Sequence, residues 1–134
     1  MNFKLLCVAI MVTLPLSLCG QSFGASGLAG EGLANPTSLQ FGPDGRLYVS
    51  QQDGTLYAYT VARNGANDYA VTATEIINSV KNISNHNDDG TVFNGSVRRQ
   101  VTGILVAGTP SVPVLYVSSS DYRIGGGGSG ADKN

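Results

Sequence analysis

Short segments that alternate apolar and polar residues, each closed by a tight turn, constrain the fold of this chain most. In the first segment Thr37, Leu39 and Phe41 alternate with polar neighbours, the period of a strand with one buried face. The run 42–45, Gly-Pro-Asp-Gly, follows it. Proline presets φ and glycine accepts positive φ, so this run predicts a turn. Residues 47–50 then form a second predicted strand.

Two further strands follow the same plan. Asp53-Gly54 is a hairpin signal, and residues 55–61 after it are predicted as the third strand. Residues 69–74 alternate as a fourth strand, beyond a polar loop at 63–68. Four antiparallel strands joined by short turns make one blade of a β-propeller. We therefore expect an all-β fold of propeller type.

The segment after the fourth strand allows two interpretations. Ile76, Ile77, Val80 and Ile83 lie at helical spacings, which is compatible with a short helix. Their β-branched side chains favour an extended strand or loop instead.

The N-terminal residues are typical of an export signal. One lysine precedes an uncharged, mostly aliphatic stretch at 5–18, which is too short to span a bilayer and matches a signal-peptide core. We predict a signal peptide over 1–24 with cleavage near Gly24, and a flexible leader over 25–34. The mature chain is then secreted or periplasmic and has no transmembrane segment. Cys19 offers the alternative of a lipoprotein anchor, although Leu18 is large for the position before a lipidated cysteine.

A repeat extends the strand pattern into the second half. Leu47-Tyr48-Val49-Ser50 recurs as Leu115-Tyr116-Val117-Ser118, and an aspartate follows each copy. An apolar strand and a turn also precede each copy. The two halves are therefore expected to share one blade plan, with long loops between strands.

The composition excludes one class of partner. The 134 residues include 8 Lys or Arg and 9 Asp or Glu, for a net charge of −1. A nucleic-acid-binding protein needs clustered basic residues to displace counterions from phosphates, so nucleic acid is not an expected partner.

The run NPTSLQFGPDGRLYVSQQDGTLYAYTV, with NHNDDG, RQVTGILV and VLYVSSSD after it, resembles the soluble quinoprotein glucose/sorbosone dehydrogenase family. The resemblance covers about residues 35–134. It implies a six-bladed propeller of which about one and a half blades are present and the remainder is missing. It also implies that the enzymatic members are oxidoreductases that use pyrroloquinoline quinone and calcium to oxidise aldoses.

One position departs from the family. The resemblance implies a catalytic histidine after the first strand of the second blade, where it takes a proton from the substrate hydroxyl. An ungapped comparison places Val106 there, and no histidine lies between Arg98 and Asn134. Valine cannot transfer a proton, so we expect this chain to be inactive alone and assign it no catalytic residue.

Two segments carry candidate binding residues. Asn85, Asn87 and Asp89 precede Gly90 with the spacing that opens a calcium loop, although Ser96 stands where a bidentate glutamate is expected. Solvated Asx turns explain the same residues. Arg99 and Gln100 precede a strand of the second blade, where ligand-facing loops of a propeller emerge. They are candidates for binding the quinone cofactor, and a solvated pair is the alternative.

The sequence thus leaves two functions open. One is an exported fragment of a quinoprotein sugar dehydrogenase-like propeller. The other is a non-catalytic extracellular propeller that binds a sugar, an extracellular polymer or a protein partner. Because one and a half blades leave an apolar face and strand edges uncovered, we also expect the mature chain to be poorly folded or to self-associate.

Overall fold

The computed structural model describes residues 24–87, 89–95 and 99–123. Within these ranges every regular element is a strand, so the predicted all-β class is confirmed. The predicted signal peptide, the alternative anchor at Cys19 and the glycine-rich run at 125–130 lie outside the described residues, apart from Gly24 itself. No helix in the described ranges is long and apolar enough to cross a membrane.

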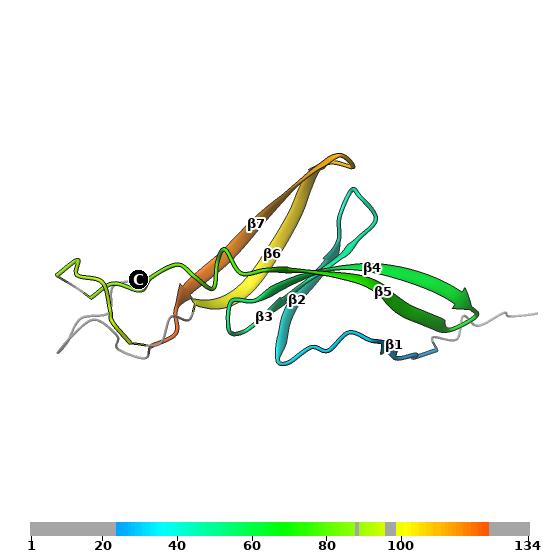
Figure 1. The fold of residues 1–134 in the computed structure, drawn as a ribbon, viewed down its shortest axis with the longest axis horizontal. Coiled ribbons are helices and arrows are strands. Elements are labelled where there is room, and N and C mark those ends of the chain that lie inside the picture. The colour runs from blue at the N-terminus through cyan, green and yellow to red at the C-terminus, as the bar shows by residue number, and fades with distance from the viewer. Residues whose placement is uncertain (1–23, 88, 96–98, 124–134) are drawn as a thin grey trace, which may run out of the picture.

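The larger sheet has five strands in the order β1-β5-β4-β3-β2 and curls along its length (Figure 1). Strands β2 to β5 are antiparallel neighbours in sequence order, whereas β1 runs parallel to β5. Each predicted strand of the first half is present. The strands are β1 (Leu28–Ala29), β2 (Pro36–Phe41), β3 (Leu47–Gln51), β4 (Leu56–Gly65) and β5 (Asp68–Ile77).

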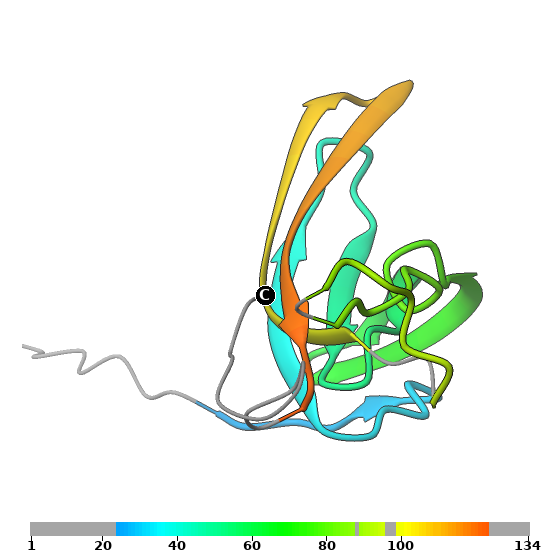
Figure 2. The same ribbon diagram turned by 90° about the vertical axis from the view of Figure 1, so that its left-hand side faces the viewer.

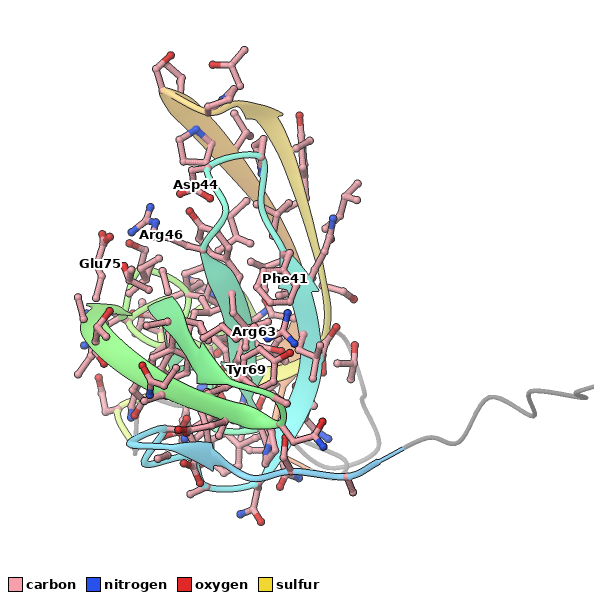
Figure 3. All side chains as sticks on the ribbon, turned by 90° about the vertical axis from the view of Figure 1, so that its right-hand side faces the viewer. Phe41, Asp44, Arg46, Arg63, Tyr69 and Glu75 are labelled. Carbon is pink, nitrogen blue, oxygen red and sulfur yellow. The ribbon has the colours of Figure 1, made fainter. Side chains whose placement is uncertain are left out.

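The turn between β2 and β3 forms as its sequence predicts. The Gly45 amide donates to the Gly42 carbonyl at 3.0 Å, and Gly45 has a φ of 78°, which favours glycine. Arg46 follows the turn and lies between Asp44 and Glu75, as Figure 3 shows. The guanidinium therefore connects this turn to β5 by ion pairs.

The β4–β5 hairpin is tighter than expected. Both strands extend into the predicted loop at 63–68, and Gly65 pairs with Asp68. Asn67 supplies the positive φ of 60° that so tight a turn needs. At the other end β5 includes Ile76 and Ile77, so the extended interpretation of these residues is correct.

The segment predicted as a flexible leader packs in part on the sheet. Leu28 and Ala29 of β1 pair with Tyr69 and Ala70 of β5. The hydroxyl of Tyr59, which is completely buried, donates to the carbonyl of Glu31. This segment therefore covers one face of the sheet over Tyr59.

The second half forms a long hairpin of β6 (Arg99–Thr109) and β7 (Val112–Asp121), closed by a two-residue loop. It stands beside β2 in both views (Figures 1 and 2). The repeated Leu-Tyr-Val-Ser motif lies in β3 and in β7, each the second strand of its hairpin. The predicted common plan of the two halves is thus present at the level of hairpins.

A small core joins the hairpin to the sheet. Val106 of β6 packs on Tyr48 of β3 and Ala58 of β4, and all three are buried. Gln40 of β2 also binds both backbone groups of Val106. Its Nε2 donates to the Val106 carbonyl at 3.1 Å, and its Oε1 accepts from the Val106 amide at 2.9 Å. These contacts attach the hairpin to the sheet.

The two copies of the repeat differ sharply in burial. Tyr48 is 3% exposed under the hairpin, whereas Tyr116, its counterpart, is 59% exposed. Leu105, Val112 and Val114 on the same face of the hairpin are exposed as well. The hairpin therefore covers the face of the first repeat, while its own outer face is open among the described residues.

Candidate ligand cleft

A cleft of about 520 Å³ lies where the strand ends of the two sheets meet. The Gln52 amide donates to the Asn35 carbonyl at 3.0 Å, and the Gln52 carbonyl accepts from the Val101 amide at 3.3 Å. These bonds hold the entry to β2, the end of β3 and the start of β6 together. The lining residues are Ala34, Asn35, Gln51, Gln52, Asp53, Lys81, Gln100 and Tyr122.

Side-chain carboxamides dominate this cleft. Asn35, Gln51, Gln52 and Gln100 all line it. None of these four carboxamides hydrogen-bonds to another group within the described ranges. A carboxamide presents a donor and an acceptor side by side. The cleft therefore offers several unused donor and acceptor pairs to a ligand.

The charges that border the cleft cancel. Lys81 Nζ lies 2.6 Å from Asp53 Oδ2 and 2.9 Å from Thr55 Oγ1. Burial opposes ionisation of Asp53, but hydrogen bonds from Lys81 and Thr55 outweigh this effect and hold its pKa below the usual value. Lys81 and Asp53 thus form an ion pair with each other, and the lining of the cleft carries no net charge.

Gly54 permits this arrangement. A Cβ at this position would lie 2.8 Å from the Arg99 carbonyl oxygen and 2.9 Å from Lys81 Cα. The residue also has a φ of 90°. Both the backbone conformation and the close approach of two other segments therefore require glycine here. The Asp53-Gly54 signal predicts the hairpin, and the structure adds this packing role.

The predicted calcium residues bind protein groups instead. Asn85 Oδ1 accepts from Arg99 Nη1 at 2.9 Å, and Asn87 Oδ1 accepts from Arg123 Nη1 at 3.1 Å. Asp89 Oδ1 accepts from the Thr91 amide and hydroxyl. The oxygens of Asn85 and Asn87 thus already bind positively charged guanidinium groups, which would repel a cation, so these residues do not fit calcium. In the described ranges no three His, Cys, Asp or Glu side chains cluster as metal ligands.

The side chains of the two residues predicted to bind the cofactor, Arg99 and Gln100, lie in different places. Gln100 lines the cleft, whereas the guanidinium of Arg99 points to Asn85 and to the Ser119 carbonyl. A quinone carboxylate would need a free cation, and Lys81, the cation of the lining, is paired with Asp53. The residues present do not fit pyrroloquinoline quinone.

Val106, which stands at the position implied for the catalytic base, lies outside the cleft. It is 5% exposed and packs in the core between the sheet and the hairpin. Its backbone groups bind Gln40, as described above. The residue therefore has a structural role in this chain.

Sequence reasoning identified Gln100 but missed most of the cleft. Gln51 is the last residue of β3, Gln52 follows it directly, and Asn35 precedes β2. Since β2 and β3 are antiparallel neighbours, the entry of one and the exit of the other share a sheet end. That adjacency was a usable signal. Lys81 and Tyr122 reach the cleft through tertiary packing and had no local signal.

An ion pair anchors the 85–93 loop next to the cleft. Arg123 Nη2 lies 2.5 Å from Asp121 Oδ2, and the two side chains are 14% and 6% exposed. The same guanidinium stacks on Phe93 at 4.1 Å and donates to the His86 carbonyl. The pair therefore links the end of β7 to the loop.

We expect the Asp121→Asn variant to lose about 2 kcal/mol of unfolding free energy at neutral pH. Hydrogen bonds from Arg123 lower the pKa of Asp121, against the opposing effect of burial. A lowered folded pKa stabilises the fold above the unfolded pKa, and this contribution is lost as pH falls through the folded value. Denaturant unfolding from about pH 6 to about pH 2 should therefore show a shallower acid loss in the variant.

The matched control is Asp68→Asn, since Asp68 is an exposed carboxylate in the β4–β5 turn. This variant should keep both the stability and the acid dependence of the parent. Equal acid dependence in Asp121→Asn and the parent chain would contradict the assigned role of the ion pair.

Comparison with known proteins gives no relative. No protein-family model, no curated protein and no solved structure matches this chain. The function is therefore argued from the cleft itself.

Proposed function

We propose that this chain is an exported, propeller-type all-β module that binds a neutral carbohydrate in the cleft between its two sheets. The observation that carries the proposal is the set of unused carboxamides at Asn35, Gln51, Gln52 and Gln100. The export signal predicted over 1–24 and the repeated hairpins support its extracellular and propeller aspects.

The chemistry of the lining favours a neutral polyhydroxylated ligand. Neighbouring sugar hydroxyls each donate and accept hydrogen bonds, which suits the paired donor and acceptor of a carboxamide. Tyr122 adds an aromatic ring whose apolar face can contact the C–H groups of a sugar. The internal Lys81–Asp53 pair leaves no net charge to attract an acidic or basic ligand.

The size of the cleft agrees with this class. Its volume of about 520 Å³ falls within the range of roughly 300–1,000 Å³ that small-molecule sites occupy. The cleft is also formed by strand ends and loops, which a sheet scaffold positions while leaving their side chains open to a ligand.

Oxidation of the bound sugar is not part of this proposal. The resemblance to quinoprotein dehydrogenases implies such a reaction, but it needs a base, a quinone and calcium. Val106 is a core residue, Arg99 binds Asn85, and the calcium candidates bind Arg99, Arg123 and Thr91. The described residues therefore support binding without turnover.

The test is a calorimetric titration of the chain with neutral mono- and oligosaccharides and, in parallel, with uronic acids. We expect binding of neutral sugars, and Gln100→Ala should raise the Kd about tenfold through the loss of one amide contact of about 1.4 kcal/mol. Gln52→Ala should act in the same direction. Circular dichroism verifies that each variant keeps the fold.

Ser111→Ala is the matched control, because Ser111 is exposed in the β6–β7 loop and should leave the Kd unchanged. The proposal is wrong if no neutral sugar binds, or if binding is confined to uronic acids. It is also wrong if sugar binding is indifferent to both glutamine variants.

A further inference from the structure

The outer edge of β7 is open, in contrast to that of β6. The free edge of β6 faces β2, where Gln40 binds both backbone groups of Val106 and the Ser38 hydroxyl lies 3.4 Å from the Ile104 amide. Strand β7 pairs only with β6 in the part of the chain that the structure describes. An unpaired strand edge is a template for another strand.

The packing at Gly108 shows which backbone groups point outward. A Cβ on Gly108 would lie 2.3 Å from the Val112 carbonyl oxygen and 3.1 Å from the Val114 amide nitrogen. These groups of Val112 and Val114 therefore face β6. Because backbone polar groups alternate along an antiparallel strand, those of Pro113, Leu115, Val117 and Ser119 face the open edge.

Two of these residues are already limited as partners. Pro113 has no amide hydrogen to donate. The Ser119 carbonyl lies 3.5 Å from Arg99 Nη2. This contact makes the carbonyl a weaker acceptor for a partner strand. Leu115 and Val117 keep both their amide and their carbonyl for a partner. The open edge is thus centred on Tyr116.

We propose that β7 pairs antiparallel with β7 of a second copy, about a two-fold axis at Tyr116. In this register Leu115 of one copy exchanges both hydrogen bonds with Val117 of the other. Ser119 donates its amide to the Pro113 carbonyl of the second copy. Pro113, which has no amide hydrogen, then lies opposite the Ser119 carbonyl, which Arg99 already approaches. This register therefore leaves the fewest backbone groups without a hydrogen-bond partner.

The side chains suit the same axis. Tyr116 would face its own symmetry mate in a non-hydrogen-bonded pair, where cross-strand side chains lie closest and aromatic pairs are favourable. It is 59% exposed in the single chain. No charged residue occurs between Val101 and Ser120, so two copies of this hairpin meet without like-charge repulsion.

Pairing of the β7 edge with a second copy is favoured over the packing of a further hairpin on the outer face of β6 and β7. The β6–β7 hairpin is attached to β2 through Gln40 and Ser38, which pair with Tyr48 and Ser50. At the matching positions opposite Tyr116 and Ser118, the hairpin itself has Leu105 and Gly103. These residues have no side-chain polar group with which to bind a further strand.

The chain's own following residues are also poor candidates for the edge. The sequence from 125 to 130 is glycine in five of six positions, and glycine disfavours strands. Pairing of this edge with residues 125–130 therefore has a weak sequence basis compared with Leu115–Ser119 of a second copy.

Sedimentation velocity of the full chain over a wide concentration range tests the proposal. We expect a reversible monomer–dimer equilibrium, and Tyr116→Lys should abolish the dimer by placing two like charges at the axis. Val112→Lys is the matched control, since Val112 is 63% exposed on the same face of the same strand. It lies away from the axis and should leave the dimer intact.

A second variant locates the axis independently of stability. In a chain with Cys7 and Cys19 replaced by serine, Tyr116→Cys should form an intermolecular disulfide on mild oxidation, because directly opposed Cβ atoms lie within reach of one. Val112→Cys should not. A chain that is monomeric at every concentration would overturn the proposal. So would a dimer or larger assembly that persists in Tyr116→Lys, or equal cross-linking at both positions.

Discussion

Replacing Tyr59 with alanine is expected to lower the unfolding free energy by about 3–5 kcal/mol, the usual cost of removing a buried aromatic ring. Tyr59 is completely buried in β4 and stacks on Tyr57 with ring centroids 5.5 Å apart. Its hydroxyl also binds the Glu31 carbonyl and so attaches the N-terminal segment. Equilibrium denaturation monitored by tyrosine fluorescence and circular dichroism measures the loss.

Tyr59→Phe separates packing from hydrogen bonding. It keeps the ring and loses only the bond to Glu31, so we expect a loss of about 1 kcal/mol. Amide exchange should also become faster at Leu28 and Ala29, which this bond holds near β5. The control is Thr60→Ala, which changes an exposed residue on the same strand and should alter stability little. A loss below about 1 kcal/mol in Tyr59→Ala would show that the ring is not packed as described.

The second large effect is expected at Gln40. Gln40→Ala leaves the Val106 amide and carbonyl without their partner, at about 1–3 kcal/mol for each buried group. Val106 is 5% exposed, so solvent cannot easily replace the lost bonds. The unfolding free energy should fall by about 2–6 kcal/mol, and amide exchange in β6 should accelerate more than in β3 and β4.

Gln40→Glu keeps the shape of the side chain and replaces its carboxamide with a titratable carboxyl group. At neutral pH its carboxylate can accept from the Val106 amide but repels the Val106 carbonyl, so the folded state should raise the pKa of this glutamate. A raised folded pKa gives stability that is complete below the unfolded pKa and is lost as pH rises through the folded value. The deficit of Gln40→Glu relative to the parent should therefore shrink from about pH 7 to about pH 4.

A deficit that is independent of pH would show that Gln40 does not donate to Val106. Gln52→Glu serves as the control for the substitution itself. Gln52 is exposed and its carboxamide makes no bond within the described ranges, so its variant should show no such pH-dependent deficit.

Local patterns predicted the strands well. The alternation of Thr37, Leu39 and Phe41 predicts β2, and the Gly-Pro-Asp-Gly run predicts the turn that follows, because both depend on residues adjacent in sequence. The buried face predicted for this strand is wrong, because Leu39 and Phe41 are 66% and 60% exposed, whereas their polar neighbours bind the β6–β7 hairpin. The same reasoning predicted a polar loop at 63–68 that is longer than the turn in the structure. Cross-strand pairing extended β4 and β5 into it, since only Asn67 had to adopt positive φ.

The cleft was less predictable because its residues come from separate strand ends. Gln100 was identified next to a predicted strand, but the direction of Arg99 was not. Its guanidinium turned to Asn85, a residue 14 positions away, and that contact also removed the calcium interpretation of Asn85. Such pairings depend on which loop packs on which strand, and no local pattern records that choice.

The repeated Leu-Tyr-Val-Ser motif shows the division most clearly. Period-2 alternation and turn residues determined that both copies form the second strand of a hairpin, because strand formation and tight turns depend on neighbouring residues. Tertiary structure alone decided that Tyr48 is buried and Tyr116 exposed, since burial depends on whether another element covers the face. Tertiary packing likewise decides that the unused carboxamides line a cleft and that the β7 edge is open for the proposed pairing with a second copy.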